Sequence, residues 1–217
     1  MNDWPTVLLG VGAAIAVSAA AVTVAWLHTR RTSVDAARDG VSAYAVGRYG
    51  PQYRFQVVAC GLSALVLAVA LARLGPAPVG GLGLLVVYGL TRIAIAAFPT
   101  DLDGPLTRTG QIHALLAAAA FIAIGIAAPT IGEFVVREAD ARVTTVLAVG
   151  ATGSARTAVL VALSAAVPLA VLATFGAGST PRTRRVFGLV ERLFYVASLS
   201  WLIVVAVLVA DTAARGS

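Results

Sequence analysis

Six apolar stretches, each about as long as a bilayer-crossing helix, constrain this chain more than any other feature. Its 217 residues are 59% hydrophobic and 12% charged, with a mean hydropathy of +0.90. About 20 consecutive apolar residues suffice for a helix that crosses the hydrocarbon core. Backbone polar groups in lipid must bond internally, so such stretches fold as helices. The sequence therefore predicts an all-α integral membrane protein, a bundle of six transmembrane helices.

The predicted spans fill one domain, residues 1–217, because no polar segment between them is long enough for a separate soluble domain. They run Thr6–Leu27, Phe55–Leu74, Val79–Phe98, Gly110–Ala128, Val143–Phe175 and Leu189–Val209. The fifth is too long for a simple crossing and contains Gly150, Gly153, Arg156 and Pro168. A tilted or kinked helix, or a short interfacial segment before it, is expected there.

The distribution of arginine predicts the orientation in the membrane. All 16 basic residues are arginine. The first, third and fifth connections and the start of the sixth span carry Arg30, Arg31, Arg38, Arg48, Arg54, Arg108, Arg182, Arg184, Arg185 and Arg192. The other side has Arg73, Arg137, Arg142, Arg156 and Arg215, beside Glu133, Glu138 and Asp140. Basic residues stay in short cytoplasmic connections, so both termini should lie outside the cytoplasm.

Composition also bears on location and excludes several function classes. Heavy use of Ala, Gly, Arg and Val without lysine is typical of a GC-rich bacterium, so the plasma (inner) membrane of a bacterium is the expected location. The net charge is +6, and the arginines lie beside the spans without interleaved aromatic residues. This arrangement argues against nucleic acid as a partner. One cysteine, Cys60, and two histidines without metal-ligand spacing predict neither a metal site nor a cofactor.

The richest polar signal is the hairpin between the third and fourth spans. Pro99 should end the third helix, and Thr107 or Thr109 should cap the fourth. Arg92 lies about 10 Å of helix rise before the proline, and His113 about one turn into the next, antiparallel helix. The two side chains can therefore share one depth in the bundle.

Each of these side chains has a structural and a functional interpretation. An arginine inside a span costs about 2.5–3.5 kcal/mol on insertion scales unless it is paired or hydrated. Arg92 could form a structural ion pair with Asp101 or Glu191, or belong to a binding site. His113 could be held by Asp101 or by a backbone carbonyl, or could transfer a proton under the influence of that carboxylate.

These residues carry a family resemblance. The sequence Phe98-Pro99-Thr100-Asp101, followed by Thr107, Gly110 and His113, resembles the signature of a bacterial membrane family catalogued as domain of unknown function 998. The resemblance extends to Ser42–Gly50 before the second span, and to Gly188–Phe194 and Trp201 in the last. It implies a six-helix membrane protein with no established activity. Glu191 stands where a glutamine is common in that family.

All three motifs fall in connections predicted to face the cytoplasm, whereas helix packing alone does not require polar signals to converge there. We therefore expect one inward-facing pocket, lined by Arg48, Tyr49, Arg92, Asp101, His113, Glu191 and Arg192. The competing explanation is the positive-inside rule, which accounts for Arg182, Arg184 and Arg185 but not for Arg92, Asp101 or His113.

Three function classes follow from this pocket. The first is binding, sensing or carriage of an anionic lipid or other amphiphile, with Arg48, Tyr49, Arg92, Glu191 and Arg192 at the headgroup. The second is an intramembrane enzyme, a hydrolase, isomerase or cyclase on a lipid or isoprenoid, with Asp101 and His113 as the catalytic acid and base. The third is a structural subunit of a membrane complex or a homo-oligomer.

Overall fold

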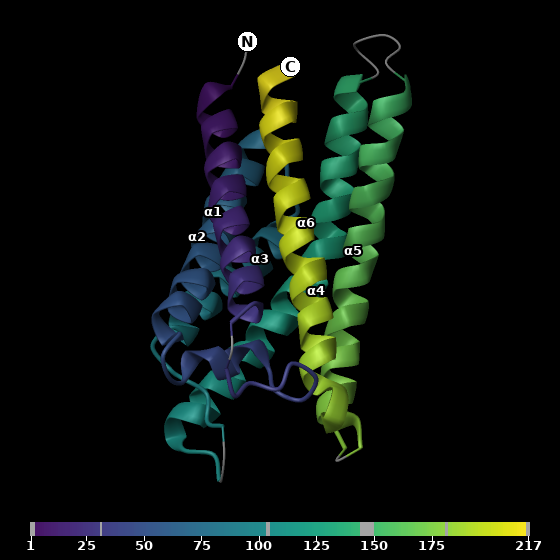
Figure 1. Ribbon diagram of the computed structural model, residues 1–217. Helices are drawn as coiled ribbons and strands as arrows, with labels where there is room; N and C mark the ends of the chain where they lie inside the picture. Colours follow the sequence, from purple (N-terminus) through teal and green to yellow (C-terminus); the bar gives the residue numbers. More distant parts are fainter. Residues whose placement is uncertain (1–2, 31, 103–104, 144–149, 181, 216–217) are drawn as a thin grey trace.

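The computed structural model describes residues 3–30, 32–102, 105–143, 150–180 and 182–215, without the side chains of 139–143 and 150–156. Every element in these ranges is helical (Figure 1). The elements are α1 (Trp4–His28), the 3-10 turn η1 (Val41–Ala45), α2 (Gly50–Leu74), α3 (Val79–Ile95), α4 (Arg108–Val143), α5 (Gly150–Gly178), the 3-10 turn η2 (Thr183–Val186) and α6 (Phe187–Arg215). The prediction of an all-α bundle of six membrane helices is therefore confirmed for the described part of the chain.

The helices pack in chain order around a ring that α6 closes against α1. α6 also contacts α2 and α4, so it is the helix with the most neighbours inside the bundle. Both ends of the described chain lie at one end of the bundle, where the backbone N–H of Asp3 donates to the carbonyl of Ala213 over 3.4 Å (Figure 1). This agrees with an even number of crossings.

Five of the described helices are long and apolar enough to span a membrane, and α3 is a shorter apolar helix of 17 residues. The predicted third span extended to Phe98, but the helix ends at Ile95. The N–H groups of Ala96, Ala97 and Phe98 each bond the carbonyl three residues earlier, which tightens the last turn before Pro99. The chain is thus a multi-pass membrane protein with one short crossing.

The predicted end of the fourth span at Ala128 is wrong. α4 continues without a break to Val143, with Pro129 inside the helix. Ile131, Phe134 and Val135 recur at helical spacing and are at most 5% exposed, so this stretch packs into the core. A proline removes only one backbone donor, and the packing of the following turns keeps the helix intact. The predicted fourth connection is therefore mostly helix.

The predicted start of the fifth span at Val143 is wrong for the same reason, because that residue ends α4. α5 begins at Gly150, and its apolar crossing runs from Thr157 to Gly178 with Pro168 inside the helix. The intervening part of the predicted span, 144–149, lies outside the described residues, as do Arg31 and the side chains of Asp140, Arg142 and Arg156.

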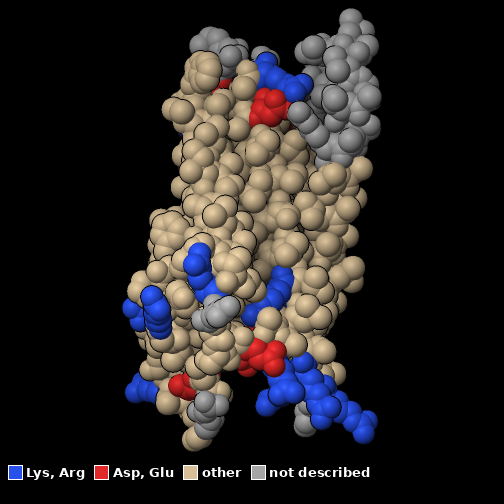
Figure 2. Space-filling view, in the orientation of Figure 1, with Lys and Arg blue, Asp and Glu red and all other residues tan. Residues whose placement is uncertain are grey.

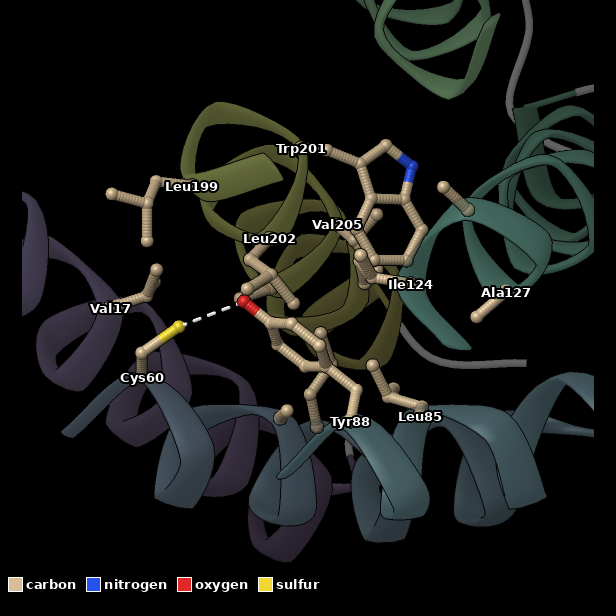
Figure 3. Packing of buried hydrophobic residues seen from close by; sticks show 14 of the residues in the cluster. Val17, Cys60, Leu85, Tyr88, Ile124, Ala127, Leu199, Trp201, Leu202 and Val205 are labelled. Atoms are coloured by element: carbon tan, nitrogen blue, oxygen red, sulfur yellow. Dashed lines mark hydrogen bonds between the residues drawn. The ribbon is translucent and has the colours of Figure 1, made fainter. Parts of the chain in front are cut away.

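The core is built mainly on α6, whose Trp201, Leu202 and Val205 are fully buried (Figure 3). Trp201 satisfies its indole N–H by donating to the hydroxyl of Ser164 on α5 over 3.0 Å. Cys60 on α2 lies in this core 3.2 Å from the hydroxyl of Tyr88 on α3, so the buried phenol has a polar contact.

α2 and α3 approach closely where two glycines face each other. A Cβ on Gly61 would lie 2.5 Å from the carbonyl oxygen of Gly89 and 2.7 Å from Cγ1 of Ile93. Small residues at a helix crossing allow backbones to approach in membranes, where no hydrophobic force drives helices together. This contact holds α3 against α2 one turn away from Arg92.

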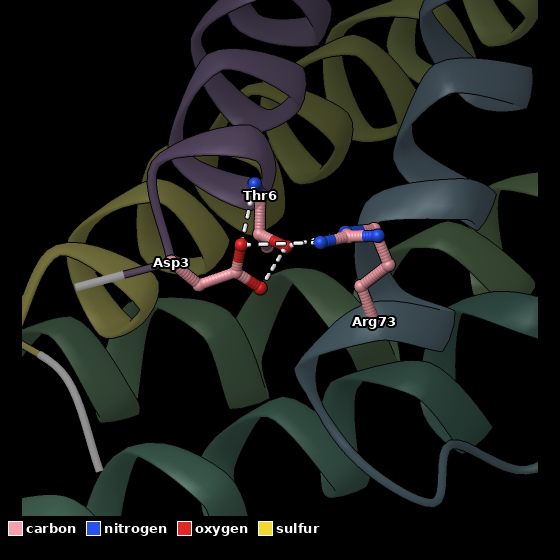
Figure 4. A network of polar contacts seen from close by, with 3 residues as sticks. All are labelled: Asp3, Thr6 and Arg73. Atoms are coloured by element: carbon pink, nitrogen blue, oxygen red, sulfur yellow. Dashed lines mark hydrogen bonds and ion pairs between the residues drawn. The ribbon is translucent and has the colours of Figure 1, made fainter. Parts of the chain in front are cut away.

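Charged side chains are concentrated toward the two ends of the bundle, and Figure 2 shows an uncharged band between the charged groups near the termini and the arginines of the lower half. At the end that carries the termini, arginines are paired with acids, as in Arg73–Asp3 and Arg215–Asp211 at 3.2 and 2.8 Å. Asp3 also caps α1 through the N–H of Thr6 (Figure 4). The opposite end holds the first, third and fifth connections and therefore the arginine excess.

Candidate functional site

The long connection between α1 and α2 crosses the arginine-rich end of the bundle (Figure 1), and we call residues 32–49 the strap. Arg192, in the second turn of α6, binds the backbone of the strap. Its Nη1 donates to the carbonyls of Ala36 and Asp39 in the strap and of Gly188 in α6, each over 2.8 Å. Its Nε donates to Nε2 of His28 over 2.6 Å. Arg192 thus ties α1, the strap and α6 together.

Glu191 is the second tie between the strap and α6. Its carboxylate is 5% exposed and accepts the backbone N–H of Val41 over 2.8 Å. Gly40 lies so close that a Cβ there would be 2.5 Å from Oε2. A larger residue at this position would press against the carboxylate, so the strap and Glu191 are in close contact here. An oxygen acceptor at position 191 is therefore sufficient for this contact.

Arg92 lies deeper, between α2, α3 and α6, and is 2% exposed. Its Nη1 donates to the hydroxyl of Tyr195 over 3.0 Å, and its Nη2 donates to Oε1 of Gln56 over 3.3 Å. The ring of Tyr195 also lies 5.1 Å from the guanidinium carbon, within cation–π range. We call Arg92, Gln56 and Tyr195 the arginine cluster.

The ion pair of Arg92 with Asp101 or Glu191, one of the two interpretations of this arginine, is not formed among the described residues, and both carboxylates bond other groups. Glu191 is near enough to feel the charge of Arg92, but it is held by the strap. The arginine charge is therefore met by neutral oxygens and an aromatic face.

Two donors of the arginine cluster are buried without an acceptor among the described residues: Nε of Arg92 and Nε2 of Gln56. The assignment of the Gln56 amide is forced, because arginine can only donate and so requires the oxygen of Gln56 on its side. Unsatisfied buried donors are rare in proteins and cost about 1–3 kcal/mol each. The cluster thus lacks acceptor oxygens.

Asp101 and His113 are not joined to each other by a hydrogen bond. Asp101 accepts from the N–H and the hydroxyl of Thr107 over 2.7 and 3.0 Å, while the Thr107 hydroxyl accepts the N–H of Gly110 as the predicted cap of α4. His113 contacts the carbonyl of Phe98 through Nδ1 over 2.7 Å, which confirms the backbone-carbonyl alternative. Both residues here stabilise the turn between α3 and α4.

Arg48 and Tyr49 lie near the surface at the end of the strap. Arg48 is exposed, with its guanidinium carbon 5.8 Å from the ring of Tyr49. Tyr49 is half-buried and packs edge-on against Trp26 at the end of α1. These contacts anchor the strap to α1, and neither residue is a hydrogen-bond partner of the arginine cluster.

The predicted pocket residues therefore divide into four groups: Arg92 in the arginine cluster, Glu191 and Arg192 as the ties of the strap, Asp101 and His113 in the α3–α4 turn, and Arg48 and Tyr49 at the end of the strap. The sequence-based prediction missed Gln56, Tyr195 and the role of His28. One signal was available for Gln56, which is a glutamine inside the predicted second span, where a polar side chain needs a partner. No comparable signal marks Tyr195, because a tyrosine at a helix end is common in membrane proteins.

Comparison with known proteins supports the resemblance read from the motifs. The family model described as "Protein of unknown function (DUF998)" matches residues 11–208. Neither the curated proteins nor the solved structures contain a match. The match covers all six described helices in whole or in large part, including the arginine cluster and both ties of the strap. The chain therefore belongs to the DUF998 family of membrane proteins.

Proposed function

We propose that this protein binds an anionic lipid or another anionic amphiphile at the arginine cluster, with the strap above it, in a binding, sensing or carrier role. One observation carries the proposal: Arg92 is buried at 2% exposure, lies in an apolar helix, and has no carboxylate at ion-pair distance among the described side chains. Intramembrane charges of this kind are expected to have a function.

A bound anion would supply what the cluster lacks. An anionic oxygen adds the attraction between opposite charges to the hydrogen bond, so it is a better acceptor for Arg92 than the neutral oxygens of Gln56 and Tyr195. The apolar helices around the cluster suit the tail of an amphiphile. The second candidate, acid–base catalysis by Asp101 and His113, has no such support, because each is bonded to the α3–α4 turn.

We further propose that the strap end faces the cytoplasm of a bacterial inner membrane. At this end the described arginines outnumber the acids, and Arg38–Asp35 is the ion pair found there, at 3.7 Å. Arginine-rich short connections are retained on the cytoplasmic side. An amphiphile held at the arginine cluster would then come from, or be sensed in, the inner leaflet.

Native mass spectrometry of the protein extracted from its own membranes tests the binding proposal. Wild type should retain a discrete lipid or amphiphile, and Arg92→Gln should lose it. Arg54→Gln is the matched control, because it removes the same charge from an exposed position on α2 close to Gln56. A wild-type protein that is folded and carries no amphiphile would reject the proposal and favour a structural subunit.

A further inference from the structure

The unsatisfied donors of the arginine cluster indicate the chemistry of the ligand's polar end. Resting on the binding function proposed above, we infer that this end is a carboxylate, as in a long-chain fatty acid, which accepts hydrogen bonds from Nε of Arg92 and Nε2 of Gln56.

The two unsatisfied donors require a ligand group that accepts hydrogen bonds and donates none. Both free atoms are N–H donors, and both belong to side chains that are at most 2% exposed. A carboxylate offers two oxygens with about four lone-pair sites and no donor, whereas an alcohol or an amide would bring a competing donor. Two oxygens on one carbon can serve the two neighbouring side chains at once.

The charge balance favours a single negative charge. Arg92 provides one positive charge to the cluster, and its hydrogen-bond partners Tyr195 and Gln56 are neutral. A group with two negative charges, such as a phosphate monoester, would leave one buried negative charge without a partner, which is costly. A monoanion would leave the cluster neutral.

The packing around the cluster favours a slim, terminal anion over a bulky headgroup. The backbones of α2 and α3 touch at Gly61 and Gly89, which closes the cluster on that side. Tyr53 lies one turn before Gln56 on α2 and Tyr88 one turn before Arg92 on α3, and both large side chains are at most 2% exposed. A phosphodiester that carries a glycerol or a further headgroup has substituents on both sides of its charge, whereas a fatty acid ends in its carboxylate.

The test uses radiolabelled palmitate as the probe, with the purified full-length protein in detergent. Wild type should bind palmitate and should bind hexadecanol, which has the same chain without the charge, at least about tenfold more weakly. Gln56→Glu is the decisive variant. This substitution places a glutamate carboxylate beside Arg92 and removes the free amide donor of Gln56. It should therefore abolish palmitate binding, while the melting temperature should stay equal or rise.

Gln111→Glu is the matched control, since it makes the same chemical change at an exposed residue in the first turn of α4 that does not bond Arg92. It should leave palmitate binding within about twofold of wild type. Palmitate and hexadecanol binding equally, or Gln56→Glu retaining palmitate, would overturn the carboxylate assignment. If the carboxylate assignment failed but wild type bound an anionic phospholipid and Arg92→Gln did not, the proposed binding function would stand. If wild type bound neither palmitate, hexadecanol nor the phospholipid, the carboxylate assignment and the binding function would both fail.

Discussion

Nε of Arg192 donates a hydrogen bond to Nε2 of His28 over 2.6 Å, joining the second turn of α6 to the last residue of α1. The other ring nitrogen of His28 lies 2.6 Å from the carbonyl of Val24, which can only accept. Nδ1 therefore carries the proton, and Nε2 offers its lone pair to the arginine. The imidazole is an acceptor for the arginine that holds the strap.

Replacing His28 with leucine should loosen the strap. Nε of Arg192 would lose its acceptor, and an unsatisfied, partly buried donor costs about 1–3 kcal/mol. The melting temperature in detergent should fall, and limited proteolysis should cut the strap sooner. His28→Gln, which retains a side-chain acceptor, should lie closer to wild type. Equal protease sensitivity of His28→Leu and wild type would rule out this role.

Glu191→Gln should fold as well as the wild type. The amide oxygen of glutamine can accept the N–H of Val41 as the carboxylate does, so the free energy of unfolding should change by no more than about 0.5 kcal/mol. Glu191→Leu leaves that N–H buried without an acceptor and should lose about 1–3 kcal/mol. Denaturant titration of both variants measures the difference, and equal losses would show that the oxygen is not what the strap requires.

Asp3 should make the bundle less stable in acid. The hydroxyl of Thr6 donates to this carboxylate over 2.6 Å, which lowers the pKa of Asp3 below its usual value; Arg73 acts in the same direction. A group with a lowered pKa in the folded state contributes stability above its unfolded pKa of about 3.9 and loses it as the pH falls through the folded pKa. Melting temperatures between pH 5 and 2 should fall less for Asp3→Asn than for wild type.

Gly61→Ala should weaken the contact between α2 and α3. The added methyl group would lie 2.5 Å from the carbonyl oxygen of Gly89, so the helices must separate, at a cost of about 1–3 kcal/mol. Gly83→Ala on α3 is the control, because a Cβ there meets nothing within 4 Å. That variant should keep or raise the melting temperature, since alanine favours helix. Similar melting temperatures for the two variants would mean that the close approach does not limit stability.

The orientation can be measured with single cysteines in a Cys60→Ser background. Ser179→Cys lies in the connection before α6 at the strap end, and Pro76→Cys lies between α2 and α3 at the end that carries the termini. In intact cells a membrane-impermeant thiol reagent should label only Pro76→Cys, and both should react after lysis. Labelling of Ser179→Cys in intact cells would reverse the orientation.

The helix count could be predicted because it depends on local composition, and the Thr107 cap because it depends on residues three positions apart. The end of the fourth span was predicted wrongly, because a proline and charged residues after Ala128 resemble a connection until the packing of Phe134 is known. The contacts of the arginine cluster could not be predicted, since Gln56 and Tyr195 lie 36 and 103 positions from Arg92 and meet it only through the packing of three helices.

The order of the helices in the chain also constrains how the protein can be made. When α3 enters the membrane during synthesis, Gln56 on α2 is already present, but Tyr195 is not made until α6 emerges. Until α6 is made, Arg92 therefore has only one of its two final side-chain acceptors. The helix that carries it, α3, has only 17 residues. Such a short segment with an arginine inserts poorly by itself. We therefore expect α2 and α3 to enter the bilayer as a pair, with α6 completing the assembly later.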